Sequence, residues 1–232
     1  MRTTEQKQEI LSRLEPTQVY ENILDASWLS RLKTIFADGD KTYKNTGPVT
    51  LDFFPEKEGY THWFSELNTL LKPYVGGEYG IFAGNFFEVK KPHILHNDDS
   101  VRWVPRLHKT VVIPIEIEQP SNFAVFDQCY LDGPVKIRSR HKPAKNVYYN
   151  QDLYDNSKLI NYTGQAFDEI LYNKYFTHQD LNAFWGLSVE KIVPWKPGNV
   201  IVFDTARIHS AVNFNAQGIS RKLGLSIFTY LK

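Results

Sequence analysis

The stretch Pro197-Gly-Asn-Val-Ile-Val-Phe-Asp204, then a loop with His209, then the run Arg221-Lys-Leu-Gly-Leu-Ser-Ile-Phe-Thr-Tyr230, decides how this chain folds. The Pro-Gly pair favours a turn, and the apolar residues after it are typical of a buried strand. In the second run Arg221 and the aliphatic residues at alternate positions after it belong to the same face of a strand. The Arg221 side chain is therefore expected to point with them towards the interior of the sheet structure. An arginine buried there requires a permanent anionic partner.

The composition indicates an ordinary globular chain. With 232 residues, 42% of them hydrophobic, one domain is expected rather than two. Lys and Arg total 27 against 26 Asp and Glu, a net charge of +1 that predicts no nucleic-acid partner. The one cysteine, Cys129, excludes an intramolecular disulfide framework and a thiolate metal cluster. Without a signal-peptide core or an apolar run of membrane-spanning length, the protein is expected to be soluble and cytoplasmic, with its oligomeric state left open.

Helical periodicity precedes strand periodicity along the chain. Amphipathic helices are predicted at residues 4–14, 26–37 and 57–72, with Pro73 ending the third. Strands are predicted at 48–54, 79–89, 108–117 and 123–130, and again between about 189 and 230. An insertion at 131–187, with short helical pieces near 164–174 and 179–186, interrupts the strands. This order predicts a mainly β fold, a sandwich or barrel buttressed by N-terminal helices over residues 1–75.

Two of the seven histidines are followed two residues later by a carboxylate, in the triplets His96-Asn-Asp98 and His178-Gln-Asp180. Thr177 before the second triplet is placed to cap a helix whose first turn would contain Asp180, so His178 is predicted to be structural. The first triplet lies at a junction between two predicted strands. There the histidine and the aspartate can offer both side chains to one metal ion.

Two histidines and one carboxylate on one face of an ion, with the other positions open, are typical of non-haem Fe(II) oxygenases. His96, Asp98 and His209 can supply this set, because His209 also lies between two strands and is followed by the inward arginine. Each histidine has a simpler interpretation. His96 can be a solvated loop residue, and His209 a hydrogen-bonded residue at a strand end. The combination is more specific than its parts.

The run from Pro197 to Asp204, with His209, Asn213 and Arg221 after it, resembles the C-terminal signature of the Fe(II)/2-oxoglutarate-dependent dioxygenases. His96-x-Asp98 is similar to the proximal metal motif of the same family. The resemblance covers roughly residues 80–130 and 190–230. Within the family, the sequence is similar in its general pattern to the prolyl hydroxylases and the phytanoyl-CoA hydroxylases. The resemblance implies a single oxygenase domain over 1–232, with a double-stranded β-helix, that is, a cupin-like jelly-roll barrel, formed by strands in 79–130 and 189–230.

The resemblance also implies roles for these residues. Arg221 would pair with the distal carboxylate of the co-substrate 2-oxoglutarate, with Thr110 or Ser226 as the second contact. His96, Asp98 and His209 would bind Fe(II), and O2 would be consumed as the co-substrate is decarboxylated to succinate and CO2. Because Asp98 is present, hydroxylation or a related oxidation is expected rather than halogenation. Isoleucine at position 227 departs from the pattern of the nucleic-acid demethylases.

Arg102, Trp103 and Arg106 follow Asp98 closely and are the candidates for substrate contact. The insertion at 131–187 is expected to form a lid, and its basic run at 136–145 can attract an anionic substrate or simply face water. The predicted function is hydroxylation of a small molecule or metabolite. The alternatives are a peptidyl (prolyl-type) hydroxylase, a cupin-type metalloenzyme without 2-oxoglutarate, and a non-catalytic binding protein.

Overall fold

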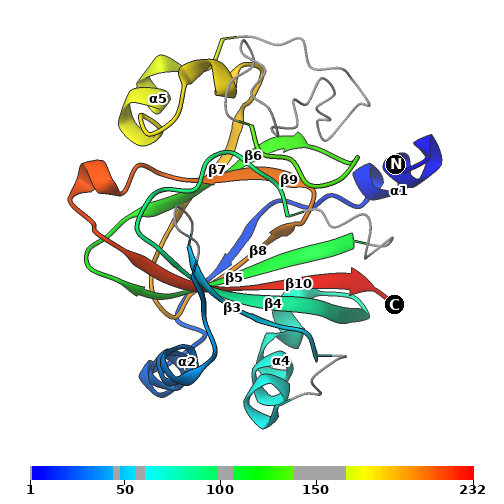
Figure 1. The fold of residues 1–232 in the computed structure, drawn as a ribbon. Helices are drawn as coiled ribbons and strands as arrows, with labels where there is room; N and C mark the ends of the chain where they lie inside the picture. Colours follow the sequence, from blue (N-terminus) through cyan, green and yellow to red (C-terminus); the bar gives the residue numbers. More distant parts are fainter. Residues whose placement is uncertain (1, 44–47, 56–60, 99–106, 138–165) are drawn as a thin grey trace.

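A computed structural model describes residues 2–43, 48–55, 61–98, 107–137 and 166–232. Its strands form two antiparallel sheets that face each other (Figure 1). The larger sheet has the order β1 (Gln18–Tyr20), β8 (Val200–Asp204), β5 (Leu107–Ile117), β10 (Lys222–Leu231), β4 (Tyr79–Val89), β3 (Val49–Phe53) and β2 (Thr42–Tyr43). The smaller has the order β7 (Val189–Pro194), β6 (Asn122–Cys129) and β9 (Arg207–Ala211). This arrangement confirms the predicted mainly β class and is consistent with a jelly roll.

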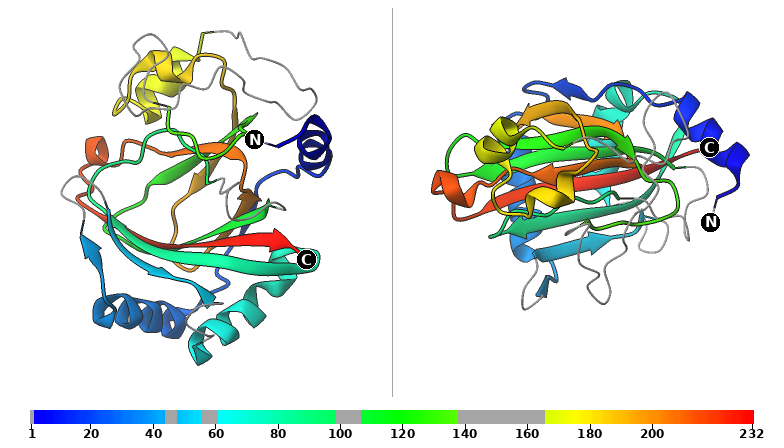
Figure 2. Two further views of the ribbon diagram at one scale, coloured as in Figure 1. Left: turned by 45° about the vertical axis from the view of Figure 1, so that its right-hand side comes forward. Right: turned by 90° about the horizontal axis from the view of Figure 1, so that it is seen from above.

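The helices lie outside the two sheets, so the molecule has four layers (Figures 1 and 2). Below the larger sheet lie α2 (Ala26–Asp38) and α4 (His62–Val75), while α1 (Thr4–Ser12) lies to one side. Above the smaller sheet lies α5 (Glu169–Tyr175), followed in the chain by the 3-10 turn η1 (Leu181–Phe184); a second such turn, η2 (Asn215–Gln217), precedes β10. No helix in the described part of the chain is long and apolar enough to cross a membrane.

Side-chain caps begin three of the helices. Thr3 and Gln6 form a reciprocal capping box on α1, Asp25 accepts a hydrogen bond from the backbone N–H of Trp28, and Asp168 caps α5. The prediction that Pro73 ends the third helix is wrong, because α4 continues to Val75 and stops at Gly76. A proline in the last turn removes one backbone hydrogen bond, while Val75, 4% exposed, gains a place in the core.

The central strand β10 divides the interior into two regions. Leu223, Leu225 and Ile227 point away from the smaller sheet and pack in the core with residues of α2 and α4. Each such buried side chain contributes roughly 1.5–3 kcal/mol to folding. The residues that alternate with them point into the space between the two sheets. The helices therefore cover the more apolar face of β10, and the more polar face lines the interior of the barrel.

The described end of the insertion, residues 166–187, packs on the outer face of the smaller sheet. Its aromatic residues Phe167, Phe176 and Phe184 contact Phe126 of β6. None of residues 166–187 lines the cavity between the sheets. Residues 138–165, on which the predicted lid mainly depends, lie outside the described residues, so the lid stays a prediction.

Candidate metal centre

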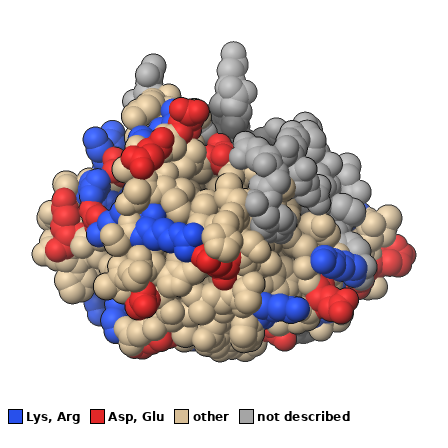
Figure 3. All heavy atoms as spheres, turned by 90° about the horizontal axis from the view of Figure 1, so that it is seen from below, with Lys and Arg blue, Asp and Glu red and all other residues tan. Residues whose placement is uncertain are grey.

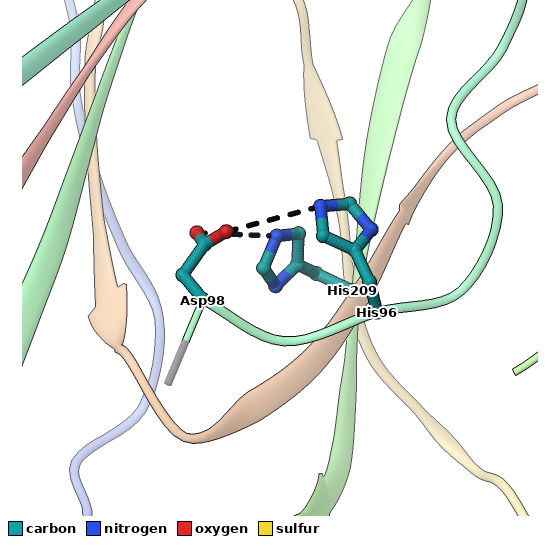
Figure 4. A group of neighbouring side chains, drawn as sticks. All are labelled: His96, Asp98 and His209. Atoms are coloured by element: carbon teal, nitrogen blue, oxygen red, sulfur yellow. Dashed lines mark ion pairs between the residues drawn. The ribbon is translucent and has the colours of Figure 1, made fainter. Parts of the chain in front are cut away.

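His209 lies on β9 with its side chain towards the larger sheet, and His96 lies beside it in the segment that follows β4. The two residues are joined by a pair of backbone hydrogen bonds, from His96 N to His209 O at 3.0 Å and from His209 N to His96 O at 2.8 Å. Two residues later, the Asp98 N–H donates to the Thr205 carbonyl at 3.4 Å. This short bridge holds three side chains from distant parts of the chain in one place (Figure 4).

The geometry of the three side chains fits a metal ion. The Nε2 atom of His209 is 3.4 Å from one Asp98 oxygen, and that of His96 is 3.9 Å from the other. The ligand atoms all lie within 4.8 Å of one another. Each imidazole places Nδ1 against a backbone carbonyl, His96 against Ile94 at 2.7 Å and His209 against Arg207 at 3.1 Å. These bonds fix the tautomer that leaves both Nε2 lone pairs free for a metal.

Burial sets the charge of the three groups. It lowers the pKa of His96 to about 3 and that of His209 to about 4, so both imidazoles are neutral at pH 7. It also raises the pKa of Asp98, against the opposing effects of His96 and of a hydrogen bond from the Thr110 hydroxyl. Two neutral imidazoles beside a desolvated carboxylate are the ligands that a divalent cation requires, and the cation would offset the burial of Asp98. The residues present fit the predicted metal site.

A cavity of about 130 Å³, here called the inner cavity, extends from the triad between the two sheets. Lys222, the first residue of β10, lines it and is 2% exposed. Its Nζ donates to the Asn122 carbonyl at 3.1 Å and lies over the rings of Trp195 and Phe214, 5.1 and 4.8 Å from their centroids. Burial lowers the pKa of Lys222 to about 7. Among the described residues, no carboxylate forms an ion pair with this ammonium group.

Trp195 also lines the inner cavity, and its indole N–H is buried without a hydrogen-bond partner among the described residues. The residue is 5% exposed. A buried N–H without a partner is costly and needs an explanation such as an unseen acceptor. The ammonium group of Lys222 lies over the face of the same ring, 5.1 Å from its centroid.

The expectation that Arg221 points into the barrel is wrong. Its side chain is 39% exposed and forms ion pairs with Glu88 at 2.7 Å and with Glu116, on the helix-covered side of the larger sheet. Arg221 does share a face with the aliphatic residues of β10, as predicted, but that face packs on α2 and α4. The next residue, Lys222, therefore lines the inner cavity. Both faces of β10 are buried, and alternation alone does not identify which of them encloses a ligand.

The other candidates are placed differently. Ser226 lines the inner cavity, as expected of a co-substrate contact. Thr110 is fully buried, and its hydroxyl is bonded to Asp98 and to the Thr205 hydroxyl, 3.1 Å away, so it supports the metal site. Arg102, Trp103 and Arg106 lie outside the described residues. His178 lies outside the triad, with its Nε2 3.4 Å from the His93 carbonyl, and its structural role stays a prediction; Asp180 rather than Thr177 caps η1.

Sequence reasoning missed Lys222 and Trp195. The signal available for Lys222 was Ser226, a small polar residue on the same face of β10 that lines the inner cavity. Trp195 precedes the Pro-Gly turn and carried no pattern of its own. Its position follows from the antiparallel pairing of β7 with β6.

The chain was compared with known proteins. No family model matches it, and no curated protein resembles it in sequence. Among solved structures it is similar to SnoN, a non-heme alpha ketoglutarate dependent epimerase of nogalamycin biosynthesis, with TM-score 0.51 and 13% identity over 98% of this chain and 83% of that one. It is similar to the carbocyclase SnoK of the same biosynthesis, with TM-score 0.52 and 11% identity over 99% and 84%. It is also similar to HygX from Streptomyces hygroscopicus, solved with nickel and 2-oxoglutarate, with TM-score 0.51 and 12% identity over 100% and 88%.

These similarities span nearly the whole chain and establish its fold. The expectation that the chain has the fold of the Fe(II)/2-oxoglutarate oxygenases is therefore confirmed. At such low identity the likeness extends to the fold alone, and the chemistry has to be argued from the residues of this chain.

Proposed function

We propose that this protein is an Fe(II)- and 2-oxoglutarate-dependent oxygenase that oxidises, most simply by hydroxylation, a small-molecule substrate. The observation that carries the proposal is the presence of two complementary sites in one cavity. An open three-residue metal site, His96, Asp98 and His209, lies in the same small cavity as Lys222, a buried ammonium that no carboxylate of the described residues pairs with. A 2-oxo acid with a second carboxylate is a ligand that satisfies both sites at once.

Each residue has a defined task in this proposal. His96, His209 and Asp98 hold the metal, and the Nδ1 hydrogen bonds keep both imidazoles in the ligating tautomer. Lys222 and the Trp195 N–H bind the distal carboxylate of 2-oxoglutarate, with Ser226 as a further contact on the same face of β10. Bound Fe(II) and 2-oxoglutarate would supply oxidative decarboxylation to succinate and CO2, coupled to oxidation of the substrate by O2. Lys222 takes the role first expected of Arg221.

A second hollow of about 370 Å³, here called the outer hollow, gives the substrate an approach. It shares Asn85, Asp98 and Phe228 with the inner cavity, and the exposed residues Asp52 and Phe54 also line it. Because Asp98 borders both spaces, a molecule in the outer hollow lies next to the metal site. Arg102, Trp103 and Arg106 remain candidates for substrate contact because they follow Asp98 in the chain.

A small molecule is favoured over a polymer. HygX has been solved with hygromycin B, and SnoN with nogalamycin RO, so this fold accommodates small-molecule substrates. The net charge of +1 gives no general attraction for a polyanion, and acidic and basic side chains are interspersed on the face of α2 and α4 seen in Figure 3. A peptidyl hydroxylase would use the same metal site and is the second candidate. A cupin-type enzyme without 2-oxoglutarate would leave Lys222 and the Trp195 N–H without a ligand.

The test is anaerobic binding followed by turnover. Fe(II) and 2-oxoglutarate are added without O2, and the visible charge-transfer band of their complex is recorded for the wild type and for His209→Ala. The proposal expects a band only in the wild type, and succinate release on admission of O2. Metal binding without any band on adding 2-oxoglutarate would exclude the 2-oxoglutarate assignment and favour the cupin alternative.

A further inference from the structure

The turn between β8 and β9, Asp204 to Arg207, contacts both segments that carry metal ligands. The Thr205 carbonyl accepts the Asp98 N–H, and the Thr205 hydroxyl reaches the Asp98 carboxylate through the hydroxyl of Thr110. At the end of the turn, the Arg207 carbonyl accepts the Nδ1 hydrogen of His209 at 3.1 Å. The position of this turn therefore sets the orientation of His209 and the place of Asp98.

The side chain of Arg207 holds one end of the turn. It is 1% exposed, which is unusual for so large a charged group. The ladder between β6 and β9 is interrupted between Val125 and Cys129, which leaves backbone carbonyls without a strand partner. Arg207 Nη1 donates to two of them, Phe126 O at 3.4 Å and Asp127 O at 3.3 Å. The guanidinium group thus takes the place of the missing ladder bonds beside the metal ligand.

Carboxylates and the N-terminal segment complete this network. Asp204 lies 3.8 Å from the Arg207 guanidinium and accepts from Lys109 Nζ at 2.8 Å. Lys109 also pairs with Glu15 at 2.9 Å, and the Glu15 N–H donates to Asp204 at 2.9 Å. The Glu15 carbonyl accepts from Arg207 Nη2 at 3.2 Å. Glu190, 3.9 Å from Arg207, accepts from Thr17 of the same segment.

The directions of these bonds distinguish the network from ordinary packing. The guanidinium group donates to three carbonyls from two separate segments and lies between two carboxylates, a set that a lysine ammonium cannot satisfy. Loss of the fork leaves the three carbonyls without their donors and removes the positive charge between Asp204 and Glu190, which favours a movement of the turn. Since the turn supplies a carbonyl to His209 and another to Asp98, any such movement reaches the metal ligands.

We propose that Arg207, Asp204 and Lys109, closed by Glu15 of the N-terminal segment, form a positioning unit for the metal centre. Arg207 is its central positioning residue, and Thr205 transmits its position to Asp98. The inference rests on the proposed metal site, but not on the identity of the co-substrate or substrate. Glu15, near the N-terminus, therefore helps to support a metal site whose first ligand in the chain is His96.

The test uses Co(II), whose visible spectrum reports the geometry of its ligands, bound to the full-length metal-free protein. The variants are Arg207→Lys, which keeps the charge but not the fork, and Thr205→Val, which removes only the hydroxyl. Co(II) affinity is expected to fall about 10- to 100-fold for Arg207→Lys and about tenfold for Thr205→Val, with an altered spectrum in both. Thr205→Ser restores the hydroxyl and should restore affinity and spectrum.

Leu67→Ala is the control for stability. Leu67 is fully buried in α4, and none of its contacts belongs to the network, so this variant loses stability but should keep the Co(II) affinity and spectrum of the wild type. Wild-type affinity and spectrum in Arg207→Lys and Thr205→Val would overturn the positioning role. If Arg207→Lys does not fold, the positioning role is tested by comparing the Co(II) affinity and spectrum of Thr205→Val with those of Thr205→Ser. Failure of the wild type to bind Co(II) would reject both this inference and the proposed function, whereas Co(II) binding without a 2-oxoglutarate complex would reject only the latter.

Discussion

Replacing Lys222 by Met is expected to weaken the binding of 2-oxoglutarate, whereas replacing its neighbour Arg221 by Met is not. Lys222 is 2% exposed in the inner cavity, and a hydrogen bond between charged partners at such a site contributes about 1.5–3 kcal/mol. At about 1.4 kcal/mol for each factor of ten, the loss corresponds to about 10- to 150-fold in affinity. Arg221 holds two ion pairs outside the cavity and is 39% exposed, so its loss costs about 0–1 kcal/mol of stability and no affinity.

The same substitution is expected to change stability in the opposite direction. An unfolded lysine has a pKa near 10.5, and burial lowers that of Lys222 to about 7. The folded protein therefore bears the full burial penalty of the ammonium at and below pH 7, and the penalty disappears as the pH rises towards 10.5. Lys222→Met should stabilise the ligand-free protein at pH 6 by roughly 1–3 kcal/mol, because the contacts with Trp195 and Phe214 offset only part of that penalty. The gain should shrink at pH 10.

The assay is an anaerobic titration of the Fe(II)-loaded variants with 2-oxoglutarate, followed by the visible charge-transfer band. Lys222→Arg serves as a matched control that keeps the positive charge, and thermal unfolding at pH 6 and pH 10 reports stability. Equal loss of affinity in Arg221→Met and Lys222→Met would refute the assignment of the two faces of β10. Unchanged affinity in Lys222→Met would refute the co-substrate site itself.

Three further predictions follow from the same site. The affinity of the wild type for 2-oxoglutarate should fall by up to about tenfold per pH unit above pH 7, because Lys222 loses its proton. Lys222→Arg should remove this pH dependence, and the same slope in that variant would contradict the prediction. Trp195→Phe keeps the ring but lacks the indole N–H, so it should weaken 2-oxoglutarate binding about 2- to 10-fold in the same titration without changing the affinity for Co(II). Mn(II) at one hundred times its dissociation constant should stabilise the wild type by about 2.7 kcal/mol in thermal or chemical unfolding, a gain that a chelator reverses and that should be absent in His209→Ala.

Much of the fold could be predicted from the sequence because strand periodicity is strong in its central part. The predicted strand at 79–89 agrees with β4. The prediction at 108–117 starts one residue later than β5, and that at 123–130 is shifted by one residue from β6. The short strands β1 and β2 were not predicted, because two or three residues show no periodicity and depend on their pairing partners β8 and β3. At Pro73 the sequence predicted a helix end that the structure does not have. The rule that proline stops a helix was outweighed there by the packing of the last turn.

The metal triad could be predicted, whereas the sequence did not point to Lys222, the residue proposed to bind the anion. His96, Asp98 and His209 carry chemistry that few other patterns explain, and the structure brings them together. Arg221 and Lys222 are adjacent cations where β10 begins, and both faces of that strand are buried, so the sequence does not say which of the two faces the cavity. That choice depends on α2 and α4, which cover the face of Leu223 and Leu225. It is a tertiary property, as is the support of the metal site by Arg207.

Substitutions on the two faces of β10 are expected to affect different properties of the protein. Substitutions at Leu223, Leu225 or Ile227 act on folding, and those on the other face act on what the cavity admits. Gly224 tolerates no side chain, because a methyl group there would meet the Phe87 and Trp195 rings at 2.7 and 2.9 Å. Trp195 belongs to the apolar cluster around Phe123 and Phe203, and Phe87 packs against it, so any side chain at position 224 would displace part of that core. Glycine is therefore required where β10 passes beside these two rings, and this position is closed to variation.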